Sequence, residues 1–428
     1  MAAIGLSNAN IEALLDPDQG VCRISCVTLS DAPATDLQDV GGLDLSLSVN
    51  IPISLQDVGS RARDRPIQAS KHAPLYSIQI LRCLVASFVI MDHILLYSAT
   101  EEIYGVNLKS IAWMFGDLGV ETFFAISGCL MMVTSQDAFG RRGAPATFIR
   151  KRFQRLIPLY WFITALLLFA IVRKHPLPPM NEILASFLFL PVTNALGEVR
   201  PVLPQGWTLN YEMLFYLIFA FSLLFAKRTG VIVLCAVFLA LFGIGLSQKS
   251  LLDTRSASTT LEFCTDPIIL TFLGGALAGL LRPMLAARLP ATSPALGLAL
   301  LAAFLLCFVG GLAILTDDSV PRSVFAKWSV HVAAVLAILI CLIPHRAPET
   351  PVARALNLLG DASFSTYLVH TFAIRWGFML VGALSIDQAF ARILLLLVFA
   401  NLFGLAVHVV LERPLLRAFR FRPFARRA

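Results

Sequence analysis

The chain has 428 residues, of which 57% are hydrophobic and 14% charged, and its net charge is +7. Soluble proteins carry roughly 45–50% apolar and about 25% charged residues, so this composition excludes a water-soluble enzyme, a disordered chain and a secreted disulfide scaffold. The mean hydropathy of +0.76 and the pI of about 9.1 are typical of a membrane protein with basic cytoplasmic loops, not of a nucleic-acid-binding protein.

Residues 1–70 are polar, unlike the rest of the chain, and they lack the basic start and apolar core of a signal peptide. We predict a mostly disordered cytoplasmic extension, although a start site assigned too far upstream would explain the stretch equally. Cys22 and Cys26 form a lone CxxxC without a partner pair, so no metal site is predicted. The extension ends in a basic stretch of Arg61, Arg63, Arg65 and Lys71.

From Leu75 onward, apolar segments repeat whose length is close to the roughly 20 residues that a helix needs to cross a bilayer. The sequence therefore predicts an all-α polytopic membrane protein, a bundle of about ten transmembrane helices over residues 75–412 with a basic cytoplasmic tail at 413–428. The predicted segments are 75–97, 111–134, 156–173, 207–226, 231–247, 267–282, 295–315, 328–344, 363–383 and 389–410.

A further apolar run at 183–193 is short and lies among prolines, so it either crosses the membrane or enters it and returns. If it crosses, the Lys and Arg residues of the loops divide evenly between the two sides. If it returns, most of them collect on the side of the N-terminus. The positive-inside rule favours the second topology, with a re-entrant segment and both termini in the cytoplasm. Irregular backbone at that depth must line a wet cavity or be buried in protein, which indicates a polar chamber open to the outer face.

The first predicted helix carries Arg82 and His93, which are eleven residues apart. Three helical turns separate them, so they share one face about 16 Å apart along the axis. A histidine is the natural general base near neutral pH, and we favour a functional pair over a packed histidine and a snorkelling arginine. Asp92 lies about 100° around the helix from His93 and need not share its cavity.

Three further groups of polar residues are candidates. Glu121 on the second helix lies at a depth comparable with His93, and Glu212 on the fourth lies one and a half turns below the outer surface. Trp207 is a binding residue or an interfacial aromatic. Arg152 and Arg155, in the loop predicted before the third helix, are three residues apart. Paired guanidinium groups suit a phosphorylated anion, although a purely topogenic cluster is the alternative.

The ninth predicted helix carries Tyr367 and His370, the latter more simply a satisfied core histidine than a catalyst. Glu412 and Arg413 close the last helix and suggest a local ion pair. No phosphate-binding loop, nucleophile elbow or zinc-protease motif is present in the sequence.

Five motifs follow one another in order: Arg82-x10-His93, GVETFFAISG at 119–128, RFQRLIP at 152–158, WTLNYE at 207–212 and LGDASFSTYLVH at 359–370. The ordered set resembles the acyltransferase-3 family of bacterial membrane O-acyltransferases, which includes exopolysaccharide, O-antigen and nodulation-factor acetyltransferases. The resemblance covers about residues 75–415. The family usually has Asp where this chain has Glu121, so the acid is kept but is one methylene longer.

The resemblance implies transfer of an acyl group, acetyl above all, from acyl-CoA to a hydroxyl of an envelope or exported glycan or a lipid-linked saccharide. Acetyl-CoA would be a co-substrate, with no bound cofactor. Arg82 and His93 would be the essential pair, with Glu121 as a catalytic acid. Arg152 and Arg155 would lie near the donor site, and Glu212, Trp207, Tyr367 and His370 are further candidates for substrate binding.

We expect His93, oriented by Glu121 or Glu212, to take the proton of the acceptor hydroxyl as it attacks the thioester; alternatively His93 carries the acyl group briefly. The implied location is the bacterial inner membrane, with lipid as a partner. A proton-coupled secondary transporter of a small anionic or sugar-like solute is the alternative function, because buried Arg, His and Glu in a bundle with a re-entrant segment also suit it.

Overall fold

The chain divides into two compact units, Met1–Pro74 and Leu75–Ala428. In the first unit, strands β1 (Asn10–Asp16) and β2 (Val21–Val27) pair in antiparallel register. The disorder predicted over 1–70 stays a prediction, because most of that stretch, including its basic end, lies outside the described residues. The computed structural model describes residues 10–16, 21–27, 76–98, 108–248, 257–288, 294–316, 324–343, 350–386 and 388–419.

The second unit is built of helices, as predicted, apart from an isolated β-bridge between Thr193 and Val199. Each predicted apolar segment forms one of them. The helices are α2 (Tyr76–Ser98), α3 (Leu108–Ser135), α4 (Ala144–Val172), α5 (Met180–Phe187), η1 (Pro204–Gly206), α6 (Trp207–Ser222), α7 (Lys227–Gln248), α8 (Thr260–Cys264), α9 (Ile269–Arg288), α10 (Pro294–Thr316), α11 (Val324–Leu342), α12 (Pro351–Ala383), α13 (Ala389–Val407), η2 (His408–Glu412) and α14 (Arg413–Ala418).

Seven helical stretches in the described part of the chain are long and apolar enough to cross a membrane. Helix α6, with 16 residues, is shorter than the roughly 20 residues of a full span. Helix α12 has 33 residues and includes Arg354, Asp361 and Arg375. The chain is a membrane protein whose helices differ widely in length and polarity.

Helix α4 begins much earlier than the sequence predicted. Its N-cap is Gly143, which has a left-handed φ of 77°, and Pro145 occupies the first turn, where a missing N–H costs nothing. The stretch from Arg150 to Arg155 is therefore helical, and the prediction of a loop there was wrong. The basic side chains interrupt the apolar run by which a membrane helix is recognised in the sequence.

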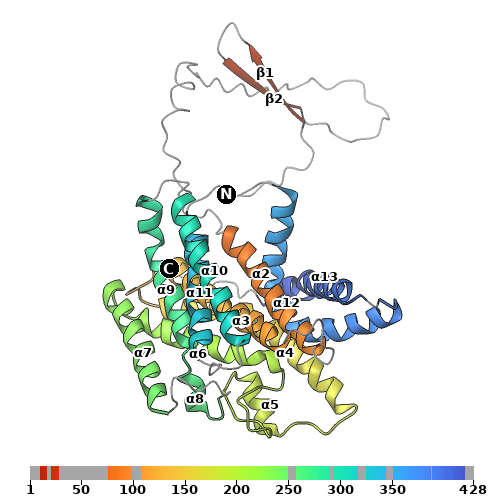
Figure 1. The fold of residues 1–428 in the computed structure, drawn as a ribbon. Helices are drawn as coiled ribbons and strands as arrows, with labels where there is room; N and C mark the ends of the chain where they lie inside the picture. Colours follow the sequence, from red (N-terminus) through yellow and green to blue (C-terminus); the bar gives the residue numbers. More distant parts are fainter. Residues whose placement is uncertain are drawn as a thin grey trace, which may run out of the picture. The chain divides into compact units, whose positions relative to one another are not determined.

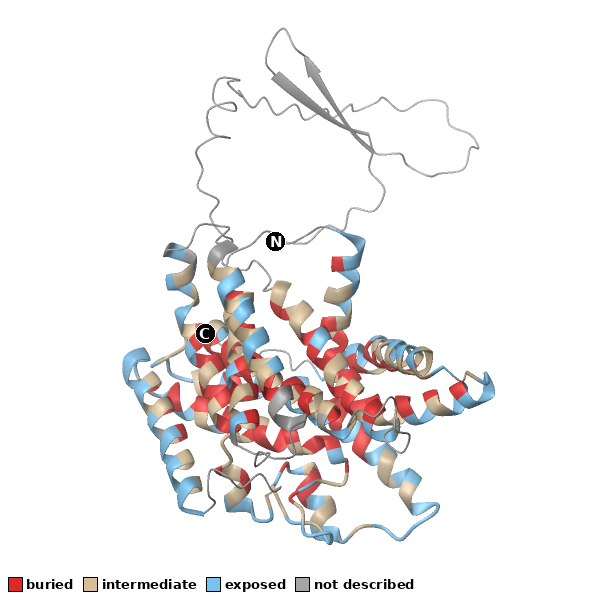
Figure 2. Ribbon diagram, in the orientation of Figure 1, coloured by how far each residue is buried: buried red, intermediate tan, exposed pale blue. Residues whose placement is uncertain are grey.

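Helices α2, α3, α9 and α12 form the centre of the bundle, with α3 packed on α2 and α9, and α12 packed on α2 and α13 (Figure 1). Helices α3 and α9 approach closely because a side chain at Gly128 or Gly275 would overlap the backbone of the other helix. Buried residues gather on the inner faces of these helices, whereas α7 is largely exposed (Figure 2).

The segment predicted to be re-entrant, 183–193, overlaps the short helix α5, whose 8 residues span about 12 Å. Its end is tied to its neighbours through Ser186. The Ser186 carbonyl accepts a hydrogen bond from the Tyr160 hydroxyl at 3.2 Å, and the Ser186 hydroxyl accepts one from the backbone N–H of Val202 at 2.8 Å. These contacts anchor the segment against α4 and against the chain that leads into η1.

Candidate functional site

A cavity of about 120 Å³ lies among helices α2, α3, α4, α6 and α12. At about 10–15 Å³ for each water position, it has room for several waters or a small acyl group. Aromatic and aliphatic side chains form most of its wall, and charged side chains enter it from separate helices. Its lining residues are Arg82, Val120, Phe123, Phe124, Ile126, Ser127, Leu130, Arg152, Arg155, Leu156, Thr208, Leu209, Glu212, Tyr216, Ser363, Phe364 and Tyr367.

The cavity brings together Arg82, Arg152, Arg155 and Glu212 from three helices. Arg82 is only 8% exposed, so its charge is buried beside the cavity. The Arg152 guanidinium lies 5.4 Å from the centre of the Phe148 ring and 5.7 Å from that of Tyr216, which keeps the charge at the wall. Positive charge therefore predominates at one cavity inside an apolar bundle.

Two hydroxyl groups shape the polar part of the cavity. The Ser127 hydroxyl of α3 donates a hydrogen bond to the Glu212 carboxylate of α6. The Tyr367 hydroxyl accepts a hydrogen bond from Thr208 at 2.9 Å and donates one to the carbonyl of Gln205 at 3.2 Å. The Glu212 carboxylate and the Tyr367 hydroxyl are thus each held by a hydrogen bond from a neighbouring helix, and both residues line the cavity.

His93 lies outside the cavity lining, and its side chain is 40% exposed. Its Nδ1 is 3.1 Å from the Asp92 carboxylate and 3.0 Å from the carbonyl of Val89. The acid beside His93 is therefore Asp92, whereas the sequence predicted Glu121 or Glu212. A side chain at Gly116 would overlap the Asp92 carboxylate, so that glycine leaves room for the acid.

An aromatic connection joins His93 to the cavity. Its ring meets the ring of His370 edge-on, with centroids 4.7 Å apart, and the His370 and Tyr367 centroids are 5.7 Å apart. His370 is 1% exposed, and its Nε2 has no hydrogen-bond partner among the described residues. Two predicted residues, His93 and His370, thus lie next to each other and reach the cavity through Tyr367.

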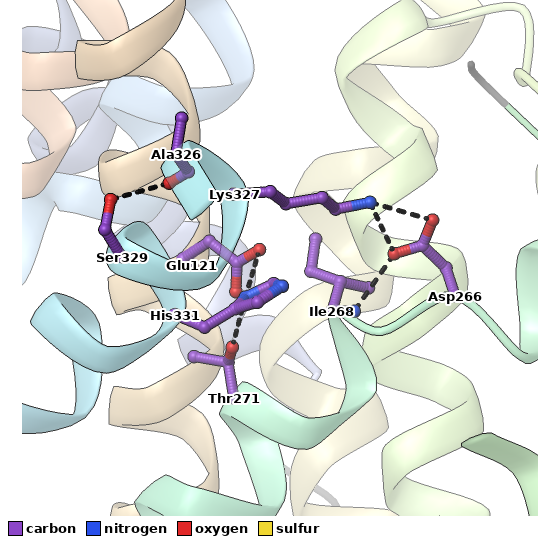
Figure 3. A network of polar contacts seen from close by, with 8 residues as sticks. All are labelled: Glu121, Asp266, Ile268, Thr271, Ala326, Lys327, Ser329 and His331. Atoms are coloured by element: carbon purple, nitrogen blue, oxygen red, sulfur yellow. Dashed lines mark hydrogen bonds and ion pairs between the residues drawn. The ribbon is translucent and has the colours of Figure 1, made fainter. Parts of the chain in front are cut away.

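Glu121 belongs to a separate network between α3, α9 and α11 (Figure 3). Its carboxylate is 2.9 Å from Nδ1 of His331, and the Thr271 hydroxyl lies 2.9 Å from the same nitrogen. Lys327 and Asp266 pair at 3.4 Å beside it. Glu121 and His331 are 4% and 5% exposed, so the pair is buried. The predicted catalytic acid therefore neither lines the cavity nor lies against His93.

We predict that the contact between Glu121 and His331 stabilises the fold. Removing one partner of a buried pair typically costs about 3–5 kcal/mol, whereas replacing both by apolar residues is often nearly neutral. His331→Leu should lower the unfolding temperature in detergent, and Glu121→Leu with His331→Leu should recover most of the loss. Equal loss in the single and double variants would contradict this assignment.

Trp207 packs edge-on against Tyr211, with ring centroids 5.9 Å apart, and does not line the cavity.

Glu412 pairs with His408, whereas the sequence predicted a pair with Arg413. It lies 2.6 Å from Nδ1 of His408 and accepts a hydrogen bond from Ser365 at 2.5 Å.

Sequence reasoning missed Thr208 and Tyr216 as cavity residues. Together with Glu212 they are spaced four apart on α6. That spacing places all three on one helical face, so periodicity around Glu212 was a signal that could have found them.

Comparison with known proteins gives a family and two relatives. Residues 75–410 match the acyltransferase-3 family, described as an acyltransferase domain. Over 318 residues the chain is 36% identical to the exopolysaccharide production protein ExoZ of Rhizobium meliloti (strain 1021), covering 72% of this chain and 92% of ExoZ. It is 27% identical over 342 residues to the acyltransferase MdmB of Streptomyces mycarofaciens, covering 72% and 84% of the two chains. No solved structure matches the chain significantly.

The matched family begins at the boundary of the second structural unit and includes every residue that lines the cavity. The comparisons support an enzyme that transfers acyl groups other than aminoacyl groups and uses an acyl donor as co-substrate. They favour this activity over the transport of a solute, which the sequence alone left open. The chain belongs to the acyltransferase-3 family.

Proposed function

We propose that this protein is an O-acyltransferase that moves a short acyl group, acetyl above all, from acyl-CoA to a hydroxyl of an envelope or exported glycan. The observation that carries the proposal is the convergence of Arg82, Arg152 and Arg155 on one cavity within a membrane bundle. The cavity lining holds three guanidinium groups and one carboxylate, that of Glu212, so positive charge remains to bind an anion such as the phosphates of CoA. The name of ExoZ, an exopolysaccharide production protein, supports a glycan acceptor.

Only the acyl-bearing end of the donor fits inside the cavity, and its phosphates bind the arginines on the side of the exposed Arg155. Arginine suits this task because its planar group donates several hydrogen bonds to one phosphate. The pantetheine arm then lies along the apolar wall, and the thioester approaches Tyr367. The Tyr367 hydroxyl already donates to the carbonyl of Gln205, so we assign it a place in the wall and no proton transfer.

His93 acts on the acceptor. Its Nδ1 faces the Asp92 carboxylate, which orients the ring and leaves Nε2 to take the proton of the acceptor hydroxyl. The acceptor oxygen attacks the thioester carbon, the bond from carbon to sulfur breaks, and the CoA thiolate leaves and takes up the proton from His93. In the alternative route His93 itself receives the acyl group and passes it to the acceptor.

We propose a topology of about ten spans with both termini in the cytoplasm of a bacterium, in its inner membrane. The shortness of α5 supports a re-entrant segment, because its 8 residues are too few to cross. Under this topology Arg152 and Arg155 lie toward the cytoplasm, where CoA is available. His93 lies toward the opposite face, where an exported glycan would be met.

The donor site makes a direct prediction. Arg152→Ala and Arg155→Ala should each raise the KM for acetyl-CoA by about tenfold or more, because each removes a charge-assisted hydrogen bond. Their kcat at saturating donor should change less. Membranes that contain each variant, given acetyl-CoA labelled in the acetyl group, provide the assay through label in glycan and lipid-linked fractions. An unchanged KM in both variants would contradict the donor site.

The same labelled donor tests the covalent route. Rapid quenching of the wild-type protein should trap labelled protein if His93 carries the acyl group, and the label should be absent from His93→Ala. Transfer to glycan without trapped label would favour direct attack. Failure of the wild-type protein to transfer label from any of several acyl-CoA donors would contradict the proposed function.

A further inference from the structure

The motif at 359–365 brings helix α12 against α2 at the height of Arg82. A side chain at Gly360 would overlap the backbone carbonyl of Gln79, so the glycine permits contact between the two helices. This contact places Asp361, the next residue, beside the Gln79 side chain. Neither Gln79 nor Asp361 lines the cavity, although Arg82 does.

Gln79 links Asp361 to Arg82 by two hydrogen bonds. Its Nε2 donates to Oδ1 of Asp361 at 2.7 Å, and its Oε1 accepts from Nη1 of Arg82 at 2.9 Å. The orientation of the amide follows from its neighbours, because a carboxylate only accepts and a guanidinium only donates. Reversing the amide would break both bonds, so Asp361 determines that the Gln79 oxygen faces Arg82.

The geometry holds Arg82 without cancelling its charge. A carboxylate in the place of the Gln79 amide would pair directly with the guanidinium and compete with an incoming anion. The neutral amide instead uses one donor of Arg82, and Asp361 acts from one residue further away. Arg155 is a like charge within electrostatic reach of the 8% exposed Arg82, whereas the carboxylates of Asp361, Glu412 and Glu212 attract its guanidinium.

We propose that Gln79 is a positioning residue that aims Arg82 at the cavity, and that Asp361 and Gly360 fix Gln79 for this task. The inference rests on the proposed function, in which the cavity binds the phosphates of acyl-CoA. It assigns to the LGDASFS motif of α12 a role in donor binding that acts through two other side chains.

Gln79→Met keeps the side-chain size and removes both hydrogen bonds. We expect it to raise the KM for acetyl-CoA and the Kd for CoA by about tenfold or more, as for loss of a hydrogen bond to a charged group, with a smaller change in kcat. Asp361→Leu should have a similar effect, whereas Asp361→Asn keeps an acceptor for the amide and should stay close to wild type. Asp361 acts on Arg82 only through Gln79, so the two substitutions should not add. The double variant Gln79→Met with Asp361→Leu should bind CoA no more weakly than the weaker-binding single variant.

Gln79→Glu tests the neutrality of the link. Its carboxylate still accepts from Arg82, but it cannot donate to Asp361 and adds a second negative charge beside it, so the Kd for CoA should rise. The matched control is Asn401→Leu, which removes another polar contact to α2, the 3.3 Å contact from Asn401 Nδ2 to the Ser87 hydroxyl. This control should leave the KM for acetyl-CoA unchanged.

Purified protein in detergent would be assayed for CoA binding, labelled transfer and thermal unfolding. An unchanged KM and Kd in Gln79→Met would overturn the positioning role while leaving the proposed function intact. Additive losses in the double variant would also overturn it. A wild-type protein that neither binds CoA nor transfers acetyl would overturn both. If Asp361→Leu does not fold, the variants Gln79→Met, Gln79→Glu and Asp361→Asn still test whether Gln79 positions Arg82.

Discussion

Replacement of His93 by alanine is expected to lower kcat for acyl transfer by roughly 10²–10⁴-fold, the range typical for loss of a general base. The reason is the pairing of its Nδ1 with Asp92 at 3.1 Å, which leaves the other ring nitrogen free to accept a proton. Donor binding should be preserved, because His93 does not line the cavity with the arginines. The measurement is single-turnover transfer of labelled acetyl in membranes, together with CoA binding by the purified variant.

The control for this experiment is His175→Ala, since His175 is an exposed histidine between α4 and α5. It should transfer acetyl as the wild type does. Asp92→Asn should show a smaller loss than His93→Ala, because it weakens the orientation of the ring but keeps the base. Equal transfer by wild type and His93→Ala would refute the proposed role, and loss of CoA binding in His93→Ala would move His93 from the acceptor side to the donor side.

Replacement of Arg82 by methionine is expected to raise the Kd for CoA by roughly 100-fold or more, the largest effect on donor binding of any single arginine in the cavity. Arg82 is the most deeply buried of the cluster and makes one hydrogen bond within the described chain, to Gln79, so its other donors are available to a phosphate. Arg82→Lys should recover part of the affinity, because it keeps the charge and loses the planar fork.

Arg173→Ala serves as the control, because Arg173 is exposed and lies over the Phe169 ring at 4.5 Å, outside the cavity. Its CoA affinity should match that of the wild type. Titration of CoA onto purified protein measures the affinity, and thermal unfolding reports whether Arg82→Met is folded. Wild-type CoA affinity in a folded Arg82→Met that transfers no acetyl would contradict a donor-binding role and place Arg82 in the chemical step.

The helices were predictable because membrane spans are selected for a local property, a long run of apolar residues. The beginning of α4 was not, because Arg150, Arg152 and Arg155 interrupt that run although they continue the same helix. The arginine cluster at the cavity was partly predictable from spacing, since Arg152 and Arg155 are three residues apart on one helix. That Arg82 joins them depends on how α2 packs against α12.

Sequence spacing does not determine which partner an acidic side chain contacts, as Glu121 and Asp92 show. Glu121 and His331 are about two hundred residues apart in the sequence, and the rotation of α3 against α11 alone brings them to 2.9 Å. Asp92 and His93 are neighbours whose side chains leave the helix about 100° apart, yet the carboxylate bends back to the ring. A helical wheel gives the direction of the Cα–Cβ bond. The contacts of the side chain depend also on its rotamer and on the helices around it.

The sequence by itself determined that this is a helical membrane protein of the acyltransferase-3 family, and it identified the arginines and the histidine that carry its proposed chemistry. Composition, helical period and ordered motifs are local properties, so they can be read along one chain. Only the tertiary structure decided that Asp92 accompanies His93, that Glu121 belongs to another network, and that Gln79 and Asp361 hold Arg82. These partnerships form between helices distant in sequence or through side-chain rotamers, and packing selects them in three dimensions.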